Sequence, residues 1–300
     1  MDYEEFLVQI KLWVQRRMGK EAKIAIFPVW KNNSILMDAM SILEPGEQCS
    51  PALYMNEFYQ EYLRHGSFEL AAKELMRRYQ YGKEQQCFNI EVLQDPKRVG
   101  KRIVTKLINR EYNRGLLNEI PHRSFLNLAV VAYYKVEDEI IGKATILVRK
   151  SHCKSWGVEE EEVIRCAREN TQKILPVKFL GIGTMLETYG YHQEAAIPMY
   201  ILTNEENYFG ASAMIFDSVL EKIGKALKDD FWILPSSIHE CIIIPAGCAM
   251  PPDEMTDLVK EVNQKEVSVE EYLSDQIYYY QTAMHRLAGV EVCSATEGES

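Results

Sequence analysis

The chain has 300 residues, of which 47% are hydrophobic and 26% are charged, and this composition excludes an intrinsically disordered chain. Its net charge of −10 is uneven: residues 1–120 carry 18 Lys and Arg against 16 Asp and Glu (+2), whereas residues 121–300 carry 16 against 28 (−12). Because an acidic surface repels phosphates, the C-terminal part is disfavoured as a nonspecific nucleic-acid binder.

The residue types indicate a cytoplasmic protein. The first 20 residues lack the basic and continuously apolar segments of a secretory signal, and no run approaches the roughly 18 apolar residues that a bilayer-spanning helix needs. Seven cysteines, an odd number, are scattered without a C-x-x-C pair. We therefore expect reduced thiols, no disulfide bonds and no membrane association.

The first part of the chain predicts a helix, a hairpin and two further helices. Apolar residues at helical spacing predict an amphipathic helix over residues 2–18. Two apolar runs of strand length, 22–30 and 34–43, flank Asn32-Asn33, which suits a tight turn. The segments 51–66 and 67–82 each begin at a helix N-terminal signal and end at a glycine.

Residues 95–115, "DPKRVGKRIVTKLINREYNRG", predict another helix, with Asp95 as its N-cap and Pro96 in its first turn. On such a helix the basic residues recur every four positions and form a basic face. This face is either solvated surface, a contact for the acidic C-terminal part, or a binding site for an acidic protein or other polyanion. No specific nucleic-acid motif accompanies it, and the interleaved aromatic residues of single-strand binders are absent apart from Tyr112. The basic residues are Arg98, Arg102, Lys106, Arg110 and Arg114.

From Phe125 onwards, pairs of strand-like runs alternate with single helical segments. The expected hairpins centre on Glu137-Asp138, on Glu205-Glu206 and on the "PSS" turn at 235–237, and a closing strand or hairpin is expected over 276–287. The expected helices cover residues 158–175, 217–230 and 251–267.

The order strand, strand, helix thus occurs four times along the chain. Hairpins that alternate with single helices predict an α+β fold with mainly antiparallel sheets, preceded by an N-terminal helix and a helical segment near 51–115. The charge change and the return of strands suggest a weakly basic region 1–120 and an acidic region 121–300, with a boundary near Pro121, although both regions are also compatible with one compact unit.

Several blocks in the same order resemble a bacterial family known as domain of unknown function 5688. They are "SPALYMNEFYQEY", "VVAYYKVEDEIIGKATILVRKSHCKSWGV", "MYILTNEENYFGASAMIF", "ILPSSIHECIIIP" and "LSDQIYYYQ". The order of these elements also distantly resembles domain of unknown function 1444. The resemblance implies a bacterial intracellular protein and supplies no catalytic residues.

The segment "PSSIHE", residues 235–240, has two interpretations. As an enzyme site, His239 would act as base, Ser236 or Ser237 as nucleophile, and Glu240 would orient the base. As a turn, Pro235 and the two serines would satisfy nearby backbone groups. The turn is favoured over a catalytic site, and a direct Cys241–His239 pair is disfavoured because strand residues two apart lie roughly 7 Å from each other at Cα.

Other chemical signals are weaker. Cys153 adjoins His152, and Lys150 and Lys154 would lower the pKa of its thiol, but a packed corner with Trp156 is favoured over a reactive cysteine. His239, Cys241 and Cys248 provide three soft ligands where structural zinc uses four, so we expect no metal and no cofactor. The sequence therefore favours a non-catalytic binding, adaptor or regulatory protein, with a hydrolase-like enzyme that uses 235–240 as the alternative.

Overall fold

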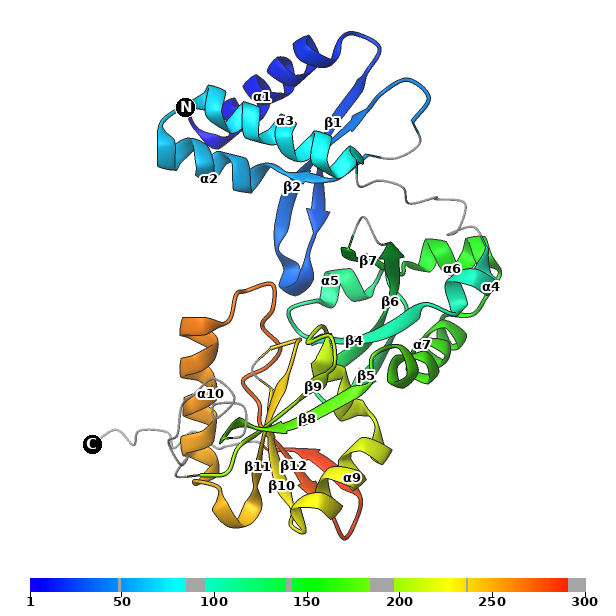
Figure 1. Cartoon of the computed structure of the whole chain (residues 1–300), viewed down its shortest axis with the longest axis vertical. Helices are drawn as coiled ribbons and strands as arrows, with labels where there is room; N and C mark the ends of the chain where they lie inside the picture. Colours follow the sequence, from blue (N-terminus) through cyan, green and yellow to red (C-terminus); the bar gives the residue numbers. More distant parts are fainter. Residues whose placement is uncertain (48–49, 85–94, 139–141, 184–196, 236, 291–300) are drawn as a thin grey trace, which may run out of the picture. The chain divides into compact units, whose positions relative to one another are not determined.

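The computed structural model describes residues 1–47, 50–84, 95–138, 142–183, 197–235 and 237–290. The chain forms two compact units: unit 1 comprises residues 1–94 and 136–144, and unit 2 comprises residues 95–135 and 145–300 (Figure 1). The charge change at residue 120 lies inside unit 2. The fold class is α+β with antiparallel sheets, as predicted.

Unit 1 packs helices on a three-stranded antiparallel sheet, and it confirms the predicted helix, hairpin and helix pair (Figure 1). Asp2 caps the first helix by accepting a hydrogen bond from the Glu5 backbone N–H (2.8 Å), and Gly66 ends the second in a left-handed conformation. Asn33 in the hairpin turn also has a positive φ of 59°. The elements are α1 (Tyr3–Met18), β1 (Lys23–Trp30), η1 (Asn32–Ser34), β2 (Leu36–Leu43), β3 (Leu53–Tyr54), α2 (Met55–His65) and α3 (Phe68–Glu84).

The core of unit 1 forms where the apolar stripes of the three helices meet the sheet. Phe6 and Ile10 of α1, Met40 of β2, Phe58 of α2 and Leu75 of α3 are all almost completely buried. The apolar residues of α1 therefore face the sheet, as their helical spacing predicts.

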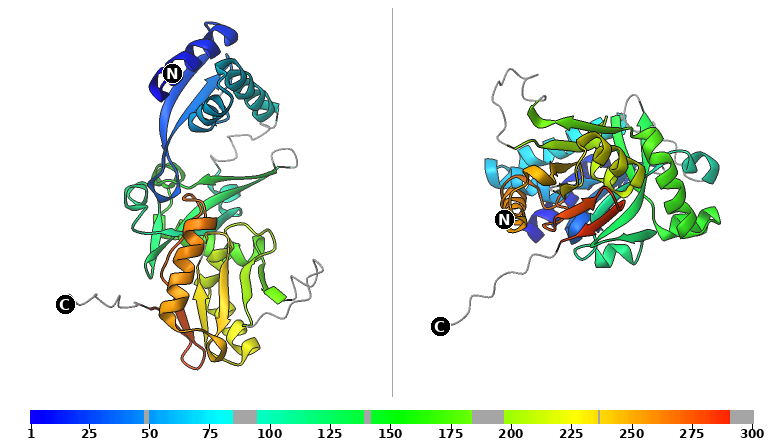
Figure 2. Two further views of the ribbon diagram at one scale, coloured as in Figure 1. Left: turned by 90° about the vertical axis from the view of Figure 1, so that its left-hand side faces the viewer. Right: turned by 90° about the horizontal axis from the view of Figure 1, so that it is seen from below.

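Unit 2 contains strands of two sheets. The first sheet has the order β4-β6-β5, with β7 also paired to β6, and the second has the order β13-β12-β10-β11-β9-β8. Figure 2 shows the strands from two further directions. Strands of the first sheet are β4 (Ile103–Asn109), β5 (His122–Phe125), β6 (Leu128–Asp138) and β7 (Gly142–Leu147); strands of the second are β8 (Val177–Gly181), β9 (Tyr200–Asn204), β10 (Phe231–Leu234), β11 (Cys241–Pro245), β12 (Tyr278–Gln281) and β13 (Arg286–Gly289).

Helices of unit 2 pack against these sheets. Helix α7 packs on β4, and α10 packs through Met255 and Val259 on the face of the six-stranded sheet that carries Leu234 and Ile277. The predicted helices at 158–175, 217–230 and 251–267 are confirmed. The helical elements are α4 (Pro96–Gly100), α5 (Arg114–Leu117), α6 (Lys150–Trp156), α7 (Glu160–Ile174), η3 (Gly210–Ile215), α9 (Asp217–Leu227), η4 (Ala246–Cys248) and α10 (Pro252–Glu266).

The predicted continuous helix over 95–115 is wrong. Asp95 does cap a helix, but α4 ends at Gly100, and residues 103–109 form β4, which is buried along its whole length. A spacing of four residues also satisfies the two-residue alternation of a strand, so the basic pattern alone does not distinguish the two structures. The β-branched run Ile103-Val104-Thr105 favours a strand, and pairing with β6 decides the outcome.

The predicted hairpin around Glu205-Glu206 is also wrong in its second strand. Residues 210–215 form η3, because Gly210 and its small neighbours pack closely against other backbone. A Cβ at Gly210 would lie 2.5 Å from the His239 carbonyl oxygen and 2.7 Å from the Thr203 Cα. Strand β9 instead pairs antiparallel with β8 on one side and with β11 on the other, and both β8 and β9 precede α9 in the chain.

The other predicted hairpins are confirmed. Strands β10 and β11 pair antiparallel, as do β12 and β13, and β6 pairs with β7. Residues 139–141, which separate β6 from β7 in the sequence, lie outside the described residues. The structure therefore matches the predicted order of strand, strand and helix only loosely.

The burial of β4 predicts a difference between two charge reversals. Lys106 is 5% exposed, whereas the side chain of Arg98 on α4 is 73% exposed. Lys106→Glu should lower the free energy of unfolding by roughly 3–5 kcal/mol, because it places a carboxylate in a site built around an ammonium group. Arg98→Glu should change it by less than about 1 kcal/mol. Urea denaturation of both variants measures this, and equal tolerance would support the exposed helix instead.

Candidate functional site

A pocket of about 510 Å³ lies in unit 2 where β4 ends. It brings together two of the predicted basic residues, Arg110 and Arg114, and adds His122 from the start of β5. Its remaining lining residues are Asn109, Glu111, Leu117, Asn118 and Asn127. Apart from the Glu111 carboxylate and the apolar Leu117, the pocket is lined by cationic, imidazole and amide groups, which are side chains that bind oxyanions in proteins.

The two arginines of this pocket differ in their partners. Arg114 pairs with Glu111 (Nη2–Oε1, 3.0 Å), and both side chains are more than 70% exposed. Within the described ranges, the Arg110 guanidinium makes no ion pair or side-chain hydrogen bond, although its backbone N–H donates to the Asn127 carbonyl (3.3 Å). Arg110 therefore offers its donors to a ligand without first losing another contact.

Buried asparagines fix the backbone around the pocket. Asn109 is 7% exposed; its amide donates to the Leu273 carbonyl (3.0 Å), and its Oδ1 accepts from the Tyr112 N–H (2.9 Å). Asn113 is fully buried and donates to the Asn109 carbonyl (2.8 Å). These bonds satisfy the backbone at the point where β4 ends and α5 begins.

A second set of bonds involves Asn127 and His122, which also line the pocket. Asn127 donates to the Ser274 hydroxyl (2.9 Å) and accepts from the Tyr278 hydroxyl (2.5 Å). The imidazole Nδ1 of His122 lies 3.2 Å from the Ile120 carbonyl oxygen, which leaves Nε2 as its other polar atom. Three asparagines and a histidine were not singled out from the sequence; their only signal there is the dense Asn content of residues 109–127.

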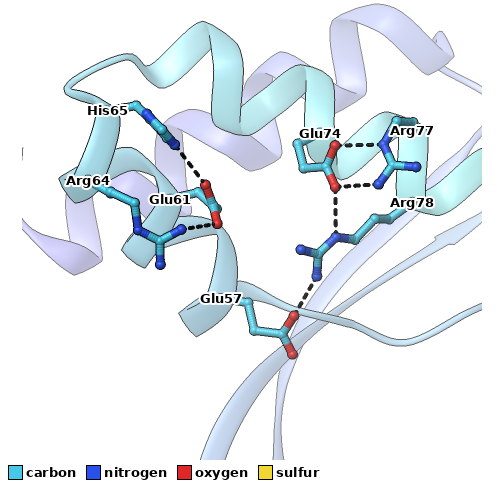
Figure 3. A network of polar contacts seen from close by, with 7 residues as sticks. All are labelled: Glu57, Glu61, Arg64, His65, Glu74, Arg77 and Arg78. Atoms are coloured by element: carbon cyan, nitrogen blue, oxygen red, sulfur yellow. Dashed lines mark hydrogen bonds and ion pairs between the residues drawn. The ribbon is translucent and has the colours of Figure 1, made fainter.

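Charges in unit 1 are arranged differently. On α2 and α3, Glu74 binds both Arg77 (2.7 Å) and Arg78 (3.0 Å), Arg78 also binds Glu57 (2.5 Å), and Glu61 binds Arg64 and His65 (Figure 3). The Arg77 hydrogen bond holds the pKa of Glu74 at about 2. Each arginine in this network already has a carboxylate partner, which makes it a poorer anion site than the pocket around Arg110.

The other basic residues of the predicted face do not join the pocket. Arg98 lies on α4 near Asp95 (3.5 Å), and Arg102 precedes β4. The Lys106 ammonium lies 4.5 Å from the centre of the Phe209 ring and 5.1 Å from that of Tyr133, so it is held by cation–π contacts. The strand thus separates residues that a helix would have aligned.

His239 lies in an aromatic cluster beside Lys106. Its ring contacts Phe209 (centroids 5.9 Å apart) and Tyr208 (5.4 Å), its Nδ1 accepts from the Phe209 N–H (3.3 Å), and its Nε2 lies 3.6 Å from Glu271 Oε1. Burial lowers the pKa of His239; the Glu271 carboxylate opposes this shift, and the Lys106 ammonium adds to it.

The nucleophile proposed for His239 has no matching contact in the described part of the chain. The Ser237 hydroxyl accepts from the His239 backbone N–H (3.1 Å), and no serine hydroxyl among the described residues bonds to the imidazole. Ser236 lies outside the described residues. The contact of Ser237 is of the kind expected for a turn, and the catalytic role of this segment stays a prediction.

Cys153 and Cys241 are buried thiols. Cys153 on α6 is 2% exposed, and burial raises its pKa, aided by Glu160 and only partly opposed by Lys150. Burial likewise raises the pKa of Cys241, which is fully buried on β11. Both environments favour the thiol over the nucleophilic thiolate.

No three or more His, Cys, Asp or Glu side chains are placed to hold a metal ion within the described ranges. In the same part of the chain, no helix combines the length and apolar character needed to cross a bilayer.

Comparison with known proteins identifies the family. The model of the Family of unknown function (DUF5688) matches residues 3–282. The chain belongs to this family. The matched residues include parts of both units. No curated protein and no solved structure matches the chain.

Thiol burial predicts the order of alkylation in the native protein. Cys248 is exposed, whereas Cys153 and Cys241 are buried with raised pKa values. Iodoacetamide should therefore modify Cys248 first, as measured by mass spectrometry of timed samples. In urea the three thiols should react at similar rates. Faster native modification of Cys153 than of Cys248 would show a reactive cysteine.

The lowered pKa of His239 predicts an acid-sensitive contribution to stability. Its folded pKa lies below the unfolded value of about 6.5, so the unfolded chain binds the proton more readily, and stability is lost as the pH falls below that value. Urea denaturation at pH 7 and pH 5 should show a smaller loss for His239→Gln than for the natural chain. An equal loss in both proteins would contradict the buried, neutral imidazole.

Proposed function

We propose that this protein is a non-catalytic binding protein that recognises a carboxylate or phosphate group of its partner in the pocket around Arg110. The observation that carries this proposal is the Arg110 guanidinium, which has no ion-pair partner among the described residues and lines one pocket together with Arg114 and His122. A planar guanidinium donates two parallel hydrogen bonds to an oxyanion, which gives both affinity and orientation.

The size of the pocket supports a small group rather than an extended surface. Its volume of about 510 Å³ lies within the roughly 300–1,000 Å³ that is usual for ligand sites. An anionic group with a few neighbouring atoms fits this space. If that anionic group belongs to another molecule, the protein binds that molecule only when it carries the group. Such selective binding gives a regulatory or adaptor role.

Residues around the pocket are held in place before a ligand binds. Asn109 and Asn127 hold the pocket's backbone through bonds to Leu273, Ser274 and Tyr278, far away in the sequence, and Asn113 adds a local bond to the Asn109 carbonyl. Because these bonds exist before any ligand arrives, the ordering cost at the moment of binding is reduced.

The test is anion binding by matched arginine variants. Isothermal titration with inorganic pyrophosphate and with citrate should show binding that weakens with added salt. Arg110→Ala should weaken it about ten-fold or more, since a hydrogen bond to a charged group contributes about 1.5–3 kcal/mol. Arg98→Ala removes the same charge from the same unit, outside the pocket, and should leave affinity nearly unchanged.

Equal effects of the two variants, or no measurable binding of either anion, would overturn the proposal. The hydrolase-like alternative predicts a different pattern. It requires a hydrolysis that His239→Gln abolishes and Arg110→Ala leaves intact.

A further inference from the structure

A second pocket, of about 360 Å³, lies on one face of the six-stranded sheet in unit 2. It is lined by side chains of β10, β12 and β13 and by Ala246. The same face packs against α10 through Leu234 and Ile277. Because side chains alternate along a strand, Trp232 shares that face with Leu234, and Tyr279 shares it with Ile277.

The strand register explains why a hollow forms there. Trp232 pairs with Tyr279, and Tyr279 pairs with Ala288 on the next strand, so two large rings are followed by a methyl group in one row across the sheet. The short side chain of Ala288 leaves open space beside the Tyr279 ring. Tyr279 and Trp232 are both only partly buried, so part of each ring remains accessible.

The aromatic wall is fixed in place before any ligand binds. The centroids of Trp232 and Tyr279 lie 4.7 Å apart, and the Tyr279 hydroxyl donates to Asp230 Oδ2 (3.0 Å). The other oxygen of Asp230 accepts from the Thr282 N–H (2.8 Å). Both carboxylate oxygens therefore already have protein partners.

The lining of the pocket includes a positively charged side chain, Arg286. Arg286 and Gln281 are directly paired across β13 and β12, and both line the pocket. Within the described ranges, the Arg286 guanidinium makes no ion pair or side-chain hydrogen bond. The pocket thus combines an aromatic wall with a cationic fork and an amide at one edge.

We propose that this pocket binds a small molecule with a planar ring and a carboxylate. The ring would stack against Trp232 and Tyr279, the carboxylate would accept hydrogen bonds from Arg286, and the Gln281 amide would bond to a polar ring atom. The volume suits one or two fused rings. This site shares no residue with the pocket around Arg110, so it stands or falls independently of the proposed function.

Three probes separate the contributions: nicotinate has ring and charge, nicotinamide lacks the charge, and cyclohexanecarboxylate lacks the planar ring. Titration calorimetry and ligand-observed NMR should show the strongest binding for nicotinate. Arg286→Gln should weaken nicotinate binding about ten-fold or more, toward the affinity for nicotinamide. Ala288→Leu should block all three probes by filling the space beside Tyr279.

Matched controls locate the binding. Arg98→Gln removes an exposed charge elsewhere in unit 2 and should leave nicotinate binding unchanged. Loss of binding in Arg110→Ala but not in Arg286→Gln would assign the carboxylate to the other pocket and overturn this proposal. Equal binding of nicotinate and cyclohexanecarboxylate, or no binding of nicotinate, would overturn it too.

Discussion

The organisation of unit 2 depends on the burial of β4 on both of its faces. The Thr105 backbone N–H donates to the Thr171 hydroxyl of α7 (2.8 Å), and the Ser212 hydroxyl of η3 donates to the Thr105 carbonyl (3.1 Å). These bonds bring α7 and η3 onto one strand residue and satisfy polar groups that would be costly to bury alone. The strand in turn fixes where Asn109 and Arg110 emerge, and thereby where the pocket that they line forms.

Arg110 and Arg286 differ from the arginines of α2 and α3 in whether a carboxylate already binds them. In unit 1 the arginines of α2 and α3 bind neighbouring glutamates, and such exposed pairs contribute little to stability while they neutralise each other. Arg110 and Arg286 instead occupy concave surfaces without a carboxylate partner among the described residues. Arg286 lies in the acidic part of the chain, residues 121–300, whereas Arg110 lies in the weakly basic part before it.

Buried polar side chains determine the geometry around both the pocket at Arg110 and His239. Asn109 and Asn127 tie the 109–127 segment to residues 273–278, and Thr203 donates to the His239 carbonyl (2.8 Å). Gly210 is required at the same place, since a side chain there would collide with Thr203 and with the His239 backbone. Backbone and aromatic contacts therefore hold His239 as part of the packing. Burial lowers the pKa of His239, the Glu271 carboxylate opposes this shift, and the Lys106 ammonium adds to it.

The sequence by itself determined the elements whose signals are local. The helix at Tyr3–Met18 follows from its apolar spacing and the Asp2 cap, and the β1–β2 and β10–β11 hairpins follow from paired apolar runs around turn residues. Tertiary structure alone decided the fate of Ile103–Asn109, because spacing by four fits a helix and a strand equally, and only pairing with β6 and cover from α7 select the strand. It also decided the two pockets. The pocket around Arg110 depends on the bonds of Asn109 and Asn127 to residues 273–278, and the pocket that Arg286 lines depends on the register that sets Ala288 beside Tyr279. Long-range pairing of this kind has no local signature in the chain, because the energy that selects it comes from burial against distant segments.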